Sequence, residues 1–86
     1  MRVTVQYFAR LHELAGEREW ICEIADGAKV IDVWNAGVER APDMAKLGGS
    51  ISCAVNADFS TLTAIVHDGD EVAFLPPVSG GASLQP

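Results

Sequence analysis

Cysteine is scarce in this chain. Only Cys22 and Cys53 occur among its 86 residues, and each lies in a separate apolar run. Two isolated thiols are too few for a structural zinc site, an iron–sulfur cluster or a disulfide scaffold. We therefore expect both to be small buried hydrophobic side chains, as free cysteines commonly are.

Basic residues are scarce as well, with six lysines and arginines against twelve aspartates and glutamates, for a formal net charge of −6. A nucleic-acid-binding domain normally presents a basic face, so this balance argues against DNA or RNA as a partner. The acidic charge is compatible with electrostatic steering onto a basic protein. It also keeps a small protein soluble, so charge alone identifies no partner.

Long hydrophobic runs are absent. No apolar stretch approaches the length of a membrane span, and the first residues lack the hydrophobic region of a signal peptide. We therefore predict a cytoplasmic protein with no membrane partner. The length and the apolar fraction of 49% predict a single folded domain.

The first 24 residues predict two strands around a short helix. Residues 1–8 alternate, with Val3, Val5 and Tyr7 on one side, and residues 19–24 alternate again. Between them, residues 9–15 have helical spacing and are followed by a glycine, a common helix C-cap. We expect the two strands to form an antiparallel pair.

A longer helix follows. Val30, Val33, Trp34 and Val38 repeat with helical periodicity, and polar residues cover the other side, so an amphipathic helix that ends near Pro42 or somewhat later is predicted. Residues 51–56 and 71–75 read as further strands, each next to a polar turn. Residues 62–66 show no clear pattern.

The order strand, strand, helix, strand, strand predicts an α+β fold with one helix across a mixed sheet of four to five strands, the β-grasp (ubiquitin-like) arrangement. A ferredoxin-like fold is less favoured because only one long helical pattern is present. We expect the last strand to lie beside the first, with the C-terminus at an edge of the sheet.

The last part of the chain carries the most specific motifs. Residues 68–74 read DGDEVAF and residues 76–81 read PPVSGG. Together with residues 5–16 (VQYFARLHELAG) and with residues 54–59, these segments resemble the small subunit of molybdopterin synthase, a ubiquitin-like sulfur carrier. The resemblance runs from residue 1 to residue 81. One departure is His12, where the family usually carries arginine, so the polar partner contact of that arginine is not expected here.

The resemblance implies a two-stage function. An ATP-dependent activating enzyme would adenylate the carboxylate of Gly81, and sulfur transfer would convert the acyl-AMP to a thiocarboxylate. The thiocarboxylate would then donate sulfur to cyclic pyranopterin monophosphate on the large subunit of molybdopterin synthase, in molybdenum cofactor biosynthesis. The chain would be non-catalytic on its own, would bind no cofactor, and would assemble as a heterotetramer of two small and two large subunits.

The chemistry of the residues agrees with that role. Gly80 and Gly81 lack side chains, so a terminal arm can enter a narrow channel in conformations closed to other residues. Pro76 and Pro77 would hold the start of the arm extended, followed by Val78. From residue 76 to residue 81 the arm would reach roughly 20 Å when fully extended.

A partner surface is also predicted. Strand parity places Phe8 and Leu75 on the face opposite the core, and adjacency of the first and last strands would bring both together with Phe59. The resemblance implies docking of both partner proteins on such a sheet face, with Pro76, Pro77 and Val78 continuing the contact. Isolated exposed hydrophobic side chains are common, so each of these residues alone would carry no function.

Other titratable residues are less informative. His12 and His67 lie in separate polar segments and are interpreted as surface histidines, and no metal site is predicted. Asp68, Asp70 and Glu71 lack the spacing of an EF-hand calcium loop, which favours a solvated turn.

Residues 82–86 follow the glycine pair and form a separate extension to the predicted 1–81 domain, whose arm begins at about residue 76. Sulfur chemistry needs a free carboxylate on Gly81, so the preferred interpretation is removal by a processing protease. The extension is otherwise a remnant of a fusion or of cloning, or it belongs to a protein that kept only binding. The alternative functions are a sulfur carrier for thiamine, thiolated tRNA or cysteine synthesis, against which PPVSGG argues, and a non-catalytic ubiquitin-like binding module with an inert tail.

Overall fold

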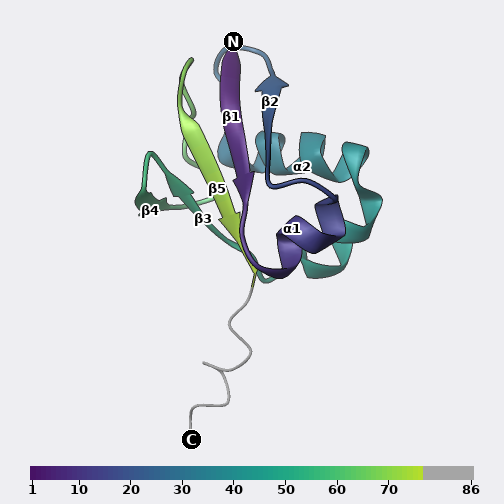
Figure 1. Cartoon of the computed structure of the whole chain (residues 1–86). Helices are drawn as coiled ribbons and strands as arrows, with labels where there is room; N and C mark the ends of the chain where they lie inside the picture. The colour runs from purple at the N-terminus through teal and green to yellow at the C-terminus, as the bar shows by residue number, and fades with distance from the viewer. Residues whose placement is uncertain (77–86) are drawn as a thin grey trace, which may run out of the picture.

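A five-stranded mixed sheet with helices on one side forms the protein, and the computed structural model describes residues 1–76 (Figure 1). The strand order is β2-β1-β5-β3-β4, in which β1 and β5 are parallel and the other neighbours are antiparallel. The elements in chain order are β1 (Arg2–Tyr7), α1 (Arg10–Ala15), β2 (Glu19–Glu23), α2 (Val30–Arg40), the 3-10 helix η1 (Pro42–Leu47), β3 (Ser52–Val55), β4 (Asp58–Ser60) and β5 (Glu71–Leu75). This is the predicted β-grasp arrangement.

The inner face of the sheet carries the core. The alternation in β1 buries Val3, Val5 and Tyr7 and leaves the residues between them more exposed, as predicted. In β5, Val72 and Phe74 face the same side and are completely buried. Burial of such side chains is the main stabilising contribution in a domain of this size.

Helix α2 covers this inner face (Figure 1). Its buried side includes Val30, Val33 and Trp34, and the Trp34 ring meets the Phe74 ring edge-on at a centroid distance of 5.1 Å. The helix begins after Lys29, whose backbone N–H donates to the Asp32 carboxylate at 2.8 Å. A carboxylate in the first turn accepts a hydrogen bond from a backbone N–H that has no partner within the helix. Its negative charge also interacts favourably with the positive end of the helix dipole. The predicted amphipathic helix is confirmed, and it ends at Arg40, two residues before a proline.

Tyr7 ties the inner face of β1 to α2 and β2. Its ring packs against Phe74, its hydroxyl accepts a hydrogen bond from Trp20 Nε1 at 2.8 Å, and it approaches the backbone of α2 at Gly37. A methyl group at position 37 would overlap the Tyr7 hydroxyl, so glycine allows this close packing of β1 against α2.

The position of the last strand corrects one expectation. β5 pairs with β1, as predicted, but it also pairs with β3, so it is the central strand and not an edge of the sheet. The reason is the β3–β4 hairpin, which adds two antiparallel strands on the other side of β5. The three-residue strand β4 and the helix η1 were not predicted. Within residues 1–76 no helix is both long and apolar enough to cross a bilayer.

Candidate functional site

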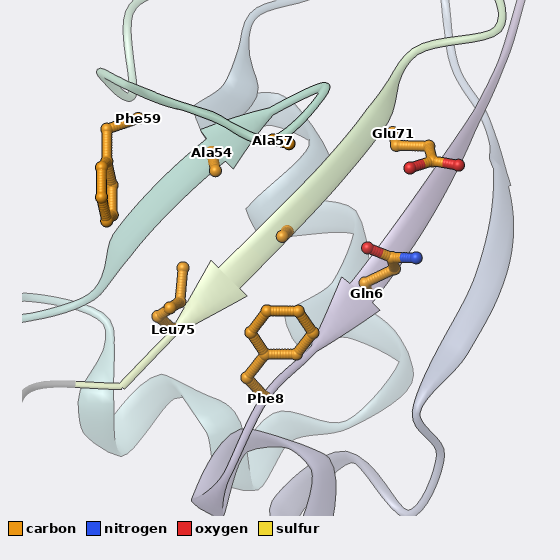
Figure 2. A pocket seen from close by; sticks show the side chains of 8 residues that line it. Gln6, Phe8, Ala54, Ala57, Phe59, Glu71 and Leu75 are labelled. Carbon is orange, nitrogen blue, oxygen red and sulfur yellow. The ribbon is translucent and has the colours of Figure 1, made fainter.

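The outer face of the sheet contains a shallow hollow of about 280 Å³ (Figure 2). Register pairs Gln6 on β1 with Ala73 on β5, Ala73 with Ala54 on β3, and Ala54 with Phe59 on β4. Because these partners lie side by side on one face, two alanines form a low floor between larger side chains. Gln6, Phe8, Ala54, Ala57, Phe59, Glu71, Ala73 and Leu75 line the hollow.

The three outward-facing hydrophobic residues predicted from the sequence meet at this hollow. Phe8 is 47% exposed and Phe59 is 82% exposed, while Leu75 is half-buried between them at the end of β5 (Figure 2). The structure therefore brings Phe8, Phe59 and Leu75 into one surface, which we call the outer-face patch. Contiguous exposed apolar surface of this kind is typical of protein interaction sites.

The backbone after β1 directs Phe8 to this face. The Phe8 N–H donates to the Phe74 carbonyl at 3.2 Å, which extends the β1–β5 pairing by one residue. Ala9 then adopts φ 53° and ψ −129°, an unfavourable conformation for a residue with a Cβ, and α1 begins immediately afterwards. The strained residue thus makes the sharp bend that ends the strand beside the patch.

The β3–β4 hairpin holds Phe59 over the alanine floor. Its turn residues Asn56 and Ala57 have φ values of 52° and 72°, the left-handed conformation that a two-residue type I′ hairpin turn requires. Asparagine tolerates this region well, whereas alanine does not.

Asn56 also fixes the start of β5. Its backbone N–H donates to the Glu71 carbonyl at 2.8 Å, and its side-chain oxygen accepts from the Glu71 N–H at 3.0 Å. Its side-chain amide donates to the Asp70 carboxylate at 3.0 Å, and the His67 N–H donates to the same carboxylate at 2.8 Å. These hydrogen bonds, first that of Asn56 and then that of His67, lower the pKa of Asp70 because they stabilise its ionised form. The acidic turn is therefore an ordered clasp between the hairpin and β5.

Glu71 marks the polar end of the hollow. It is exposed and, of the eight residues that line the hollow, it alone is charged. Figure 2 shows Glu71 and Gln6 on neighbouring strands at one end, with Phe8, Leu75 and Phe59 toward the other. The hollow thus has an acidic end and an aromatic end.

The predicted arm starts at the aromatic end. Leu75 is the last residue of β5, and Pro76, which is half-buried, follows it directly. Pro77, Val78, Gly80 and Gly81 lie outside the described residues. The central strand of the sheet therefore leads from the acidic end of the outer-face hollow to the start of the arm.

The cysteines do not belong to the site. Cys22 and Cys53 are free and buried, as predicted, and burial raises the pKa of both thiols. A raised pKa disfavours the nucleophilic thiolate. Cys53 Sγ lies 3.3 Å from the Ser60 carbonyl, which it contacts as a donor across the hairpin.

The histidines do not converge either. His67 is exposed at the acidic turn, with Nδ1 3.8 Å from the Asp70 carboxylate, and His12 is half-buried on α1. Among residues 1–76 no three histidine, cysteine, aspartate or glutamate side chains lie together as a metal site would require.

Sequence reasoning missed the residues that shape the hollow. Ala54, Ala73 and Gln6 belong to it only because three separate strands pair in this register. The alternation in β5 places Ala73 on the same face as Glu71 and Leu75, so its place in the site could have been predicted from the sequence. No pattern in the sequence indicates the hydrogen bonds that Asn56 makes in the clasp.

Comparison with known proteins identifies the family to which the sequence is similar. The sequence model of the ThiS family matches residues 5–81. The molybdopterin synthase sulfur carrier subunit of Chlamydomonas reinhardtii is 34% identical over 83 residues, which cover 94% of this chain and all of that protein. The human molybdopterin synthase sulfur carrier subunit is 31% identical, with 93% of this chain and 94% of that protein covered.

Solved structures show the same fold. SAMP1 from Haloferax volcanii superposes with a TM-score of 0.82 at 30% identity, covering 94% of this chain and 100% of that chain. A complex of subunits 1 and 2 of the molybdopterin-converting factor from Helicobacter pylori contains a chain with a TM-score of 0.63 at 23% identity, covering 91% of this chain and 96% of that chain. At that identity the likeness concerns the fold alone.

Proposed function

The chain belongs to the ThiS family, and from this premise we propose that it is the sulfur-carrier subunit of a molybdopterin synthase, the family that its motifs resemble. The support is the agreement of two independent findings. Relatives that align over nearly their whole length are named as such subunits, and the outer-face patch lies where the chain leaves the sheet toward the arm.

The proposed chemistry takes place at Gly81. A carboxylate is a poor electrophile, so an activating enzyme first joins it to AMP from ATP and releases pyrophosphate. A sulfur donor at the oxidation level of sulfide then displaces AMP and leaves a thiocarboxylate. Its sulfur attacks a carbon of cyclic pyranopterin monophosphate on the large subunit, where a carbon–oxygen bond breaks, and gives a thioester between Gly81 and the pterin. Water then hydrolyses the acyl–sulfur bond, which leaves the sulfur on the pterin and restores the Gly81 carboxylate, and two such donations form the dithiolene. Gly81 and Gly80 are thus the reacting end of the chain, and acid–base groups come from the partner proteins.

The outer-face patch would be the surface on which the partner proteins bind. Phe8, Phe59 and Leu75 would dock on the large subunit and on the activating enzyme in turn, and Pro76, Pro77 and Val78 would continue the contact along the arm. An aromatic residue as exposed as Phe59 gains free energy only when a partner covers it. The single structural observation that carries the proposal is that the central strand β5 runs along this hollow and ends at Leu75, directly before Pro76, the start of the arm.

The sequence continues for five residues beyond Gly81, where the family match ends. We propose that a protease removes residues 82–86 before activation, because adenylation requires the carboxylate of Gly81. The assembled synthase would be a cytoplasmic heterotetramer of two small and two large subunits.

Reconstituted sulfur transfer tests the proposal. The form ending at Gly81 is incubated with the large subunit, the activating enzyme, ATP, a sulfur donor and cyclic pyranopterin monophosphate, and molybdopterin formation is measured. We expect product with this form and none with the full chain in the absence of protease, and a loss of product on Gly81→Ala. A form ending at Gly81 that binds the large subunit but yields no product would instead indicate a binding module with an inert tail, and full activity of Gly81→Ala would contradict the assigned role of Gly81.

A further inference from the structure

The side chain of Glu71, the charged residue of the hollow, has no partner within residues 1–76. Its main chain is fixed on both sides by Asn56, through the 2.8 Å and 3.0 Å hydrogen bonds described above. The side chain itself is exposed, and within residues 1–76 no hydrogen bond or ion pair engages its carboxylate. The neighbouring acidic residues differ, since Asp70 is held by Asn56 and His67 and Asp68 accepts from the Arg2 N–H at 2.8 Å.

The hollow beside Glu71 has room for partner side chains. Its volume of about 280 Å³ lies just below the lower limit for small-molecule sites, which is about 300 Å³. The alanine floor at Ala73 and Ala54 and the flanking Phe8 and Phe59 suit one or two inserted apolar side chains. Insertion there would remove water from the whole surface of the hollow, including its acidic end.

Removal of water makes an unpaired carboxylate costly. A charge that loses its hydration must be compensated by an opposite charge or by hydrogen bonds, otherwise binding is weakened. Any protein that fills the hollow therefore has to place a cation or hydrogen-bond donors against Glu71, and of these a cation also neutralises its charge. Glutamine at position 6, the other polar residue at that end, offers no positive charge.

We propose that Glu71 is a specificity residue of the outer-face patch, and that it pairs with an arginine or lysine that the large subunit presents beside the apolar side chain it inserts into the hollow. This inference rests on the proposed function. A second copy of this chain fits poorly, because none of the residues that line the hollow is a cation that could pair with Glu71, and two proteins that each carry a formal charge of −6 repel each other.

The experiment is a binding measurement with the large subunit of the same organism as the probe. Wild type is compared with Glu71→Gln and Glu71→Lys, in the full chain and in the form ending at Gly81. We expect the Kd to rise about tenfold for Glu71→Gln and about a hundredfold for Glu71→Lys, since like charges are brought into contact in the second case. Binding of wild type should weaken with added salt, and Glu71→Gln should flatten that dependence.

Glu39→Gln and Glu39→Lys are the matched controls, since Glu39 is exposed on α2, on the other side of the sheet. These variants change the net charge equally and should leave the Kd within about twofold. The inference is wrong if the Glu71 and Glu39 variants bind the large subunit with the same Kd and the same salt dependence. The proposed function still stands in that case, provided that wild type binds and transfers sulfur. If wild type does not bind the large subunit in either form, both are wrong.

Discussion

Replacing Phe59 by alanine separates binding from folding most cleanly. Phe59 lies on the short edge strand β4 and is 82% exposed, so the folded domain gains little from burying it. A phenylalanine side chain buries at least about 150 Å² when covered, of which about 120 Å² is still available here. At about 25 cal/mol per Å², a partner that covers the ring would gain about 3 kcal/mol.

Part of that gain is lost to the ordering of side chains and to incomplete contact, so we expect Phe59→Ala to weaken binding to the large subunit by about 2 kcal/mol, or about thirtyfold in Kd. The free energy of unfolding in urea should change by less than about 0.5 kcal/mol, as for other exposed substitutions. Titration calorimetry and urea unfolding of the same preparation provide the two values.

Ile65→Ala is the matched control. Ile65 is also a large exposed hydrophobic residue, at 55% exposure, but it does not line the hollow. Its truncation should leave the Kd unchanged. Equal losses of affinity for the two variants, or a loss of fold stability for Phe59→Ala as large as its loss of affinity, would refute the assignment of the outer-face patch as the docking surface.

Three further predictions concern the fold that supports the site. Gly37→Ala should destabilise the protein by about 1–2 kcal/mol in urea, because overlap with the Tyr7 hydroxyl outweighs the gain in helix propensity; an increase in stability would contradict the packing described. Ala9→Gly should raise the free energy of unfolding by about 1 kcal/mol by relieving the positive φ, and an unchanged value would show that no strain is stored there. Hydrogen bonds from Asn56 and His67 hold the folded-state pKa of Asp70 below its ordinary value of 3.8. This carboxylate therefore contributes stability above that pH, and the contribution is lost as the pH falls through the folded-state pKa. Asp70→Asn should therefore be less stable than wild type at neutral pH and flatten the loss of stability below about pH 4, and parallel pH profiles would contradict the clasp.

The sequence predicted the elements whose patterns are local. Alternation in residues 2–7 and helical spacing from Val30 to Val38 both depend on near neighbours in the chain, and both assignments agree with the structure. The face on which Phe8 and Leu75 lie followed from the same two-residue period of strands.

The features that were not predicted depend on contacts between segments that are distant in the sequence. A three-residue strand such as β4 has no period of its own, and it forms because Asn56 and Ala57 adopt a left-handed turn with alanine where glycine would be the usual signal. The central place of β5 follows from simultaneous pairing with β1 and β3, which no local pattern encodes. For the same reason the hollow at Ala54 and Ala73 was not predicted.

The most direct test of the central claim is the intact mass of the protein isolated from its own cells. We predict a chain that ends at Gly81, with part of the population heavier by the exchange of one oxygen for one sulfur. A chain that still ends at Pro86 in cells that are making molybdenum cofactor, with no sulfur-containing form, would contradict the assignment as a sulfur carrier.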